Sequence, residues 1–249
     1  QSTHVNLPFK NNKEFGSLHA AIRLLLPILP AISASSPIFE GHPTGFRCSR
    51  LEAYRQNQKK IPSITGVVIP EAVFSEKAYY KKIYTPIMRD IAPYDPKQIL
   101  EHHYLNSRGA IARFDRGAIE IRVLDIQECP KADLAIVEAI LATLKWIIKE
   151  IPLAQQKKWD EKELAVIFND CIRNAERSVN NDQKYMQLFG ITDNKISANE
   201  LWRKLLSRIK PDMYPELYVV FEQIVSHGSL STRIMRHLNG DSSKANIFK

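Results

Sequence analysis

One strand, the stretch from Gly117 to Asp125, constrains the fold more than any other part of the sequence. Successive side chains of a strand point to opposite faces, so the alternation of residue types separates two surfaces. One face holds three apolar residues, Ile119, Ile121 and Val123. The other face carries Glu120 and Arg122, followed by Leu124. The strand therefore needs an apolar cover on one side and presents a carboxylate beside a guanidinium on the other.

The Glu120 and Arg122 pair has two interpretations. Exposed pairs of this kind are common on ordinary half-buried strands, and they contribute little to stability. The alternative is a binding site that uses both charges. The nine residues alone favour the surface pair, so the neighbouring segments must decide between the two interpretations.

The same strand forms one arm of a predicted hairpin. Residues 110–114 pair with residues 118–124, because Gly117 supplies the positive φ that a tight turn needs. With a two-residue loop, Arg113 falls opposite Glu120, which places charge against charge. A slip of one residue would destroy this match.

A second predicted strand begins the chain. Residues 3–9 alternate so that Val5 and Leu7 face the core while His4 and Asn6 lie on the opposite face. Residues 15–33 follow with apolar residues at helical spacing, and two prolines within this helix are expected to kink or break it. Helices are also predicted over residues 49–58 and 75–90, separated by a short extended piece at 67–69.

Everything after Pro130 has helical periodicity. Helices are predicted over 131–150, 161–179, 198–209, 211–226 and 229–238. Asp160 and Glu163 have the spacing of an acidic cap for the second of these helices. The pattern predicts an α+β fold, with an antiparallel sheet platform and a largely helical C-terminal half.

We expect one catalytic-type domain over residues 1–249. Within it, 1–130 provides the sheet and the site segments, 131–238 provides the helices, and 239–249 is a polar, loosely held tail. The most apolar run, residues 20–34, contains Arg23 and two prolines, so no membrane span is predicted.

The charge balance and the cysteines narrow the class of protein. There are 35 Lys and Arg against 27 Asp and Glu, a formal charge of +8, but the basic residues are spread along the chain. Nucleic acid is therefore a weaker interpretation than a small anionic ligand, although a basic binding module without catalysis remains the alternative. The three cysteines lack metal-binding spacing and are predicted to be free thiols in a cytoplasmic protein.

Other candidate residues have weaker patterns. Arg47 and Arg50 lie three apart and share a helical face if the helix starts early enough; a solvated basic helix is the alternative. His102 and His103 are adjacent, so on a strand they face opposite ways, and further zinc ligands at a suitable spacing are missing. We interpret the two histidines as structural.

Four segments in order resemble one family of enzymes. They are Ser2–Phe9, the run from Leu18 to Gly41 with its Ser-Ala-Ser-Ser-Pro-Ile-Phe-Glu-Gly end, Thr44–Arg50 and Ala118–Asp125. Together they resemble the glutamate-cysteine ligase family of the second type, which comprises carboxylate-amine ligases related in fold to glutamine synthetase. The resemblance covers most of residues 1–150, and the helical remainder matches only in character.

The resemblance implies an ATP- and Mg²⁺-dependent ligase. In this chemistry ATP phosphorylates a carboxylate, typically the γ-carboxyl of glutamate, and an amine then displaces phosphate to form an amide. With cysteine as the amine, the product is γ-glutamylcysteine, a step of glutathione biosynthesis. Phosphoryl transfer between anions needs divalent metal and cationic donors, which matches the residues already singled out.

The resemblance also implies a role for each candidate. Glu120 is the metal ligand, and His4, Asn6 and Arg122 contact the nucleotide. Arg122 is also catalytic with Arg113, since a planar fork suits phosphate oxygens. Arg50 and Arg47 bind the substrate carboxylate.

One departure from the family limits these roles. Family members carry an additional N-terminal region with a Glu-x-Glu-type strand, which supplies further metal-binding carboxylates, and nothing like it occurs here. We therefore expect the sequence to be the C-terminal two thirds of a longer protein that acts on small molecules and that can form homo-oligomers. A degenerate family member without catalysis is the other interpretation.

Overall fold

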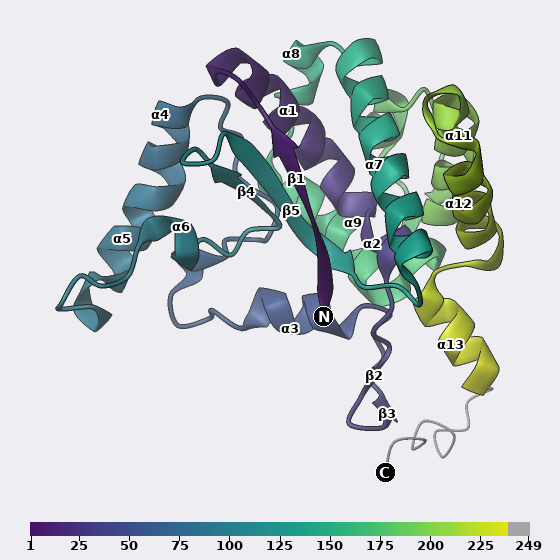
Figure 1. Cartoon of the computed structure of the whole chain (residues 1–249), viewed down its shortest axis with the longest axis horizontal. Coiled ribbons are helices and arrows are strands. Elements are labelled where there is room, and N and C mark those ends of the chain that lie inside the picture. The colour runs from purple at the N-terminus through teal and green to yellow at the C-terminus, as the bar shows by residue number, and fades with distance from the viewer. Residues whose placement is uncertain (239–249) are drawn as a thin grey trace.

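The computed structural model describes residues 1–238, and the predicted tail 239–249 lies outside this part. Its first half contains β1 (Ser2–Pro8), α1 (Asn12–Leu25), η1 (Leu26–Ile28), α2 (Pro30–Ser33), β2 (Ile38–Phe39), β3 (His42–Pro43), α3 (Ser49–Gln56), η2 (Pro62–Ile64), α4 (Glu76–Tyr79), η3 (Tyr80–Tyr84), α5 (Thr85–Ile91), η4 (Ala92–Tyr94), α6 (His102–Leu105), β4 (Ala110–Arg113) and β5 (Ala118–Asp125). The chain is α+β, as predicted (Figure 1).

The second half is mainly helical. It contains α7 (Pro130–Glu150), α8 (Leu153–Gln156), α9 (Glu161–Asn174), η5 (Ala175–Arg177), β6 (Val179–Asn180), α10 (Gln183–Leu188), β7 (Ile196–Ser197), α11 (Ala198–Ile209), η6 (Lys210–Asp212), α12 (Pro215–His227) and α13 (Leu230–Leu238). The predicted capping box is present, since Asp160 and Glu163 each accept a backbone N–H at the start of α9. α9 ends earlier than predicted because Ala175 adopts φ 48°, which an α-helix cannot continue.

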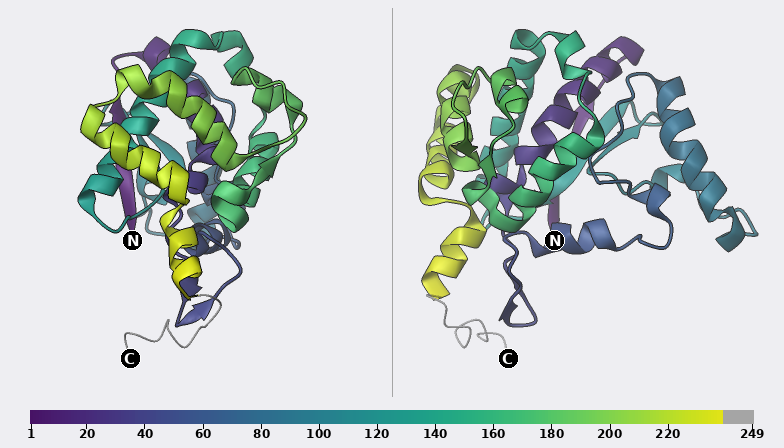
Figure 2. Two further views of the ribbon diagram at one scale, coloured as in Figure 1. Left: turned by 90° about the vertical axis from the view of Figure 1, so that its right-hand side faces the viewer. Right: turned by 180° about the vertical axis from the view of Figure 1, so that it is seen from behind.

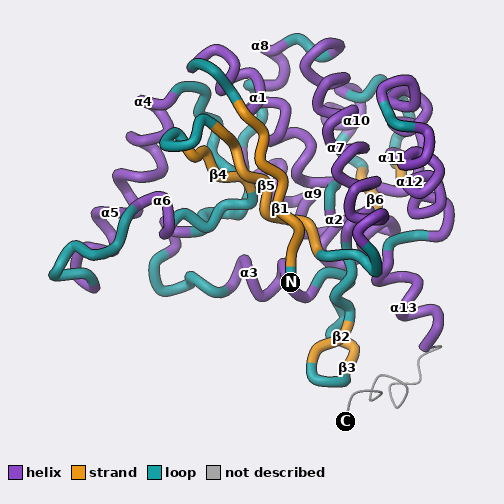
Figure 3. The backbone as a smooth tube through the Cα atoms, viewed as in Figure 1, coloured by secondary structure: helices purple, strands orange, loops and turns teal. Residues whose placement is uncertain are grey.

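The main sheet is antiparallel with the order β1–β5–β4, so β5 is the central strand and pairs with the strand that opens the chain. Figure 3 shows these three strands side by side, with the small β2–β3 pair projecting separately. The proline prediction for the first helix is confirmed. α1 ends at Leu25, and a 3₁₀ turn that contains Pro27 separates it from α2, which begins at Pro30.

Helices cover one face of this sheet. α1 passes behind β1 and β5 in Figure 1 and in front of them in the reversed view of Figure 2. The apolar face of β5 is fully buried there, with Ile119, Ile121 and Val123 at 0% exposure. One hydrophobic cluster joins residues from both halves of the chain, from Val5 to Val225. Since the apolar side of β5 is packed, Glu120 and Arg122 project from its other face, which we call the open face, where their side chains are 17% and 31% exposed.

The register of the β4–β5 hairpin differs from the prediction. Arg113 pairs with Ala118, and Ile111 pairs with Glu120, so Arg113 does not lie opposite Glu120. The connection is the four-residue turn 114–117 rather than a two-residue loop. Asp115 in this turn accepts two hydrogen bonds from the Arg113 guanidinium, at 3.0 and 2.9 Å, which stabilise the longer turn.

Candidate functional site

Three predicted residues come together on the open face of the sheet. His4 Nδ1 lies 2.7 Å from Glu120 Oε1, and Arg122 Nε lies 3.5 Å from the same oxygen. Asn6 is the register partner of Glu120 on β1. The pairing of β1 with β5 shifts between Thr3 and Val5, and such an irregularity can re-aim the side chain between them. His4 lies two residues from Asn6 on the same face of β1, which is within reach of the Glu120 carboxylate.

The arginine of this group is incompletely paired. Arg122 Nε is buried and has no hydrogen-bond partner in the described part of the chain. Its 3.5 Å approach to Glu120 is an ionic contact without a well-formed hydrogen bond. Buried donors normally have a partner, so this N–H is available to an anionic ligand. The Arg122 side chain as a whole is 31% exposed, which leaves it accessible from solvent.

A second arginine lies beside the same strand. Arg50 on α3 donates from Nε to Asp125 Oδ1, and its Nη1 is 3.5 Å from the carbonyl oxygen of Arg122. Its Nη2 is buried without a partner among residues 1–238. Arg50 therefore has one edge fixed by the protein and one donor left for a ligand carboxylate or phosphate.

Sequence reasoning did not assign a role to Asp125. This carboxylate is 1% exposed, and it also accepts hydrogen bonds from the Ser35 backbone N–H at 3.0 Å and from Ser36 Oγ at 2.7 Å. Asp125 thereby ties the small-residue loop and α3 to the end of β5. The sequence alone shows Asp125 only as an acidic residue at the end of a strand. The residues that contact its carboxylate are all distant along the chain.

Tyr54 is a further residue that the sequence prediction missed. Burial raises the pKa of its hydroxyl above the usual value, while the nearby charges of Arg122 and Arg50 oppose that rise. Its hydroxyl donates to the Arg108 carbonyl oxygen at 3.4 Å. Tyr54 and Arg50 are four residues apart on α3, and this spacing indicates a shared helical face.

Two other predicted arginines have different surroundings. Arg113 is held by Asp115, and its hydrogen bonds keep the pKa of the Asp115 carboxyl below the usual value. Arg47 precedes α3, which begins at Ser49, so the expected shared helical face with Arg50 is wrong. Burial and the neighbouring Arg177 lower the pKa of Arg47.

The histidine pair lies on a short helix, α6, and the assumed strand is wrong. His102 stacks against Tyr84 with ring centroids 4.3 Å apart, and His103 Nε2 lies 2.9 Å from Glu101. Within residues 1–238, no group of three or more His, Cys, Asp and Glu side chains is arranged to hold a metal ion.

Comparison with known proteins identifies the family of this chain. The model of glutamate-cysteine ligase family 2 matches residues 1–246. The chain belongs to this family. It is also 41% identical over 235 residues to an uncharacterized protein of Archaeoglobus fulgidus, and the match covers 90% of this chain. The chain spans 62% of the length of that relative.

Proposed function

We propose that this chain forms part of an ATP- and Mg²⁺-dependent carboxylate-amine ligase that makes an amide through an acyl-phosphate. Glutamate and cysteine are the proposed substrates, which makes γ-glutamylcysteine the product and glutathione biosynthesis in the cytoplasm the setting. Membership of glutamate-cysteine ligase family 2 supports the reaction class. No described helix is long and apolar enough to cross a membrane, and all three cysteines are free.

The observation that carries the proposal is a pair of guanidinium donors without partners in residues 1–238, one on β5 and one on α3. Arg122 Nε and Arg50 Nη2 are both buried without a hydrogen-bond partner in the described residues. Arg50 Nη1 and the Arg122 carbonyl oxygen are 3.5 Å apart, which places the two residues beside each other. Two arginines with spare donors suit a substrate that carries carboxylate and phosphate groups.

The residues present fit Mg²⁺ in a limited way. Mg²⁺ prefers oxygen ligands and usually takes one or two carboxylates together with water and substrate phosphates. Glu120 offers one carboxylate, and its hydrogen bond with His4 orients it on the rigid β5 strand. When bound, the metal would neutralise charge on the nucleotide phosphates.

The roles of the other residues follow from their positions. Arg122 would hold phosphate oxygens next to Glu120, and Arg50, fixed by Asp125, would hold the carboxylate of the amino acid. Asn6, opposite Glu120, is proposed as a nucleotide contact together with His4. Arg113 and Arg47 remain proposed contacts of phosphate and substrate, respectively. The family relationship further supports a sheet platform like that of glutamine synthetase and allows a homo-oligomer.

The test is ADP release by the whole protein from which this sequence comes. With MgATP and a panel of amino acids and amines, the proposal predicts ADP formation only when an acid and an amine are both present. Glu120→Gln should reduce this rate by about 100-fold or more, the usual cost of losing a group that stabilises charge during reaction. The exposed Glu216→Gln is the matched control and should keep the normal rate.

A protein that releases no ADP above background with every acid and amine pair would contradict the proposal. An unchanged rate in Glu120→Gln would contradict the assigned site while leaving the reaction class intact.

A further inference from the structure

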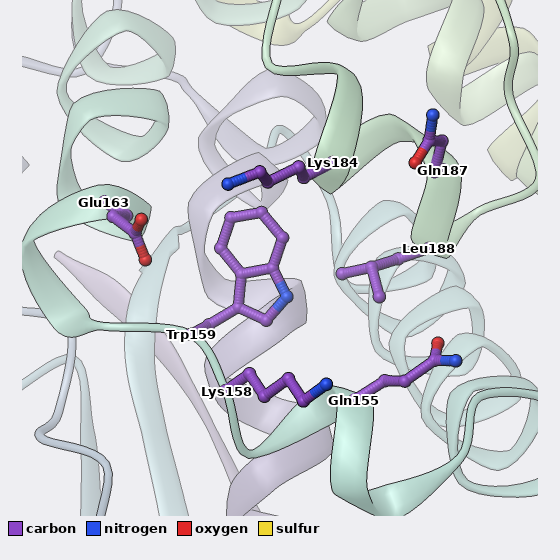
Figure 4. A pocket seen from close by; sticks show the side chains of 7 residues that line it. All are labelled: Gln155, Lys158, Trp159, Glu163, Lys184, Gln187 and Leu188. Carbon is purple, nitrogen blue, oxygen red and sulfur yellow. The ribbon is translucent and has the colours of Figure 1, made fainter.

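A cavity of about 650 Å³ lies between α8, α9 and α10, and none of the proposed ligase residues lines it. Its walls are formed by Gln155, Lys158, Trp159, Glu163, Lys184, Gln187 and Leu188. Figure 4 shows the Trp159 indole between the side chains of Lys158 and Lys184. The volume is within the usual range of pockets that bind small molecules.

The tryptophan in this cavity has an unused donor. Trp159 is 7% exposed, and its indole N–H makes no hydrogen bond to the described residues. Trp202, which is fully buried, instead donates its Nε1 to the Ile28 carbonyl oxygen at 3.0 Å. The Trp159 N–H opens to the cavity, so it is available to an acceptor on a ligand that enters there. In Figure 4 its nitrogen lies on the side of the ring that faces Leu188 and Gln187.

The surrounding side chains are donors as well. Lys158 and Lys184 are exposed and form no ion pair within residues 1–238, and the exposed amides of Gln155 and Gln187 form no hydrogen bond there. The carboxylate in the wall, Glu163, already accepts the Asp160 backbone N–H at 3.1 Å as part of the α9 cap. The cavity therefore presents two ammonium groups and an indole N–H to a ligand that enters from solvent.

We propose that this cavity is a second ligand site, which binds a small organic anion with two or more carboxylate or phosphate groups. The two lysines hold the anionic groups, the indole N–H donates to one of their oxygens, and Leu188 contacts the carbon skeleton. An anion also offsets the mutual repulsion of the two ammonium groups. Because the lining residues include none of those on β1, β5 and α3, the proposal does not depend on the ligase reaction.

Calorimetric titration of the whole protein tests this inference. Citrate represents the carboxylate source and fructose 1,6-bisphosphate, which carries two phosphates, the phosphate source, each titrated at constant ionic strength. At least one probe should give saturable binding. Lys158→Gln and Lys184→Gln should each weaken that binding by about tenfold or more, since hydrogen bonds to charged groups contribute strongly. Trp159→Phe, which keeps the ring and removes the N–H, should weaken it less, by roughly fivefold.

Two controls separate this site from general charge effects and from the ligase site. Lys145→Gln removes an exposed charge outside the cavity and should leave the affinity unchanged. Glu120→Gln should also bind the probe normally. The proposal is overturned if neither probe binds the unmodified protein, or if Lys145→Gln weakens binding as much as the cavity variants do. Thermal unfolding of each variant checks that it is folded.

Discussion

Two arginines, each beside a glutamate, have opposite surroundings in this molecule. Arg108 is 3% exposed at its side chain and donates to both oxygens of Glu71, with further donations to the Ser63 carbonyl oxygen and to Asn106 Oδ1. Arg122 approaches Glu120 at 3.5 Å and leaves its buried Nε unpaired. We therefore expect the fully satisfied arginine to stabilise the fold, and we propose that the unsatisfied one binds a ligand.

The largest expected effect is on stability at the first of these arginines. Arg108→Met removes a bidentate ion pair and leaves Glu71 and several acceptors without their donor, so the free energy of unfolding should fall by about 3–5 kcal/mol. The same change at the other arginine, Arg122→Met, should cost less than about 1 kcal/mol. Urea unfolding of both variants measures the difference. Equal losses of unfolding free energy would remove the distinction between the Arg108–Glu71 and Arg122–Glu120 pairs.

Two histidines extend the comparison between interior and open face. His19 is fully buried, both of its ring nitrogens lack a partner in residues 1–238, and burial lowers its pKa to about 3. His4, in contrast, is partly exposed and bonds Glu120. In the unfolded chain an imidazole titrates near pH 6.5. The unfolded state therefore binds more protons than the folded state between pH 6.5 and 3, and His19 makes the protein less stable as pH falls through this window.

The expected contribution of His19 approaches about 1.4 kcal/mol for each pH unit below 6.5. His19→Leu, a change of similar volume, removes this titration. Urea unfolding at pH 6.5, 5.5 and 4.5 should show a shallower loss of stability for the variant than for the unmodified protein. If the free energy of unfolding fell equally with pH in the variant and the unmodified protein, His19 would be protonated in the folded state or accessible to water.

Local patterns predicted those parts of the fold that depend on neighbouring residues. The alternation in β1 and β5, the break at Pro27 and the Asp160 cap were all predicted because each is decided within a few residues. The hairpin register was mispredicted, since a side-chain bond from Arg113 to Asp115 favours a longer turn.

The candidate site was only partly accessible to sequence reasoning. Alternation and family motifs found Glu120, Arg122 and His4, but Asp125 is defined by contacts with residues 75 to 90 positions away. Tyr54 likewise comes near Arg122 only because α3 folds beside the end of β5. Such long-range contacts have no local sequence pattern, apart from the four-residue spacing that relates Tyr54 to Arg50.

The central claim is that the incompletely paired arginine on the open face serves chemistry rather than stability. ADP release by Arg122→Met in the whole protein, with MgATP, an acid and an amine, tests it most directly. We predict a rate lower by about 100-fold or more, with a free energy of unfolding within about 1 kcal/mol of the unmodified protein. A normal rate, or a loss of rate explained by unfolding, would contradict the claim.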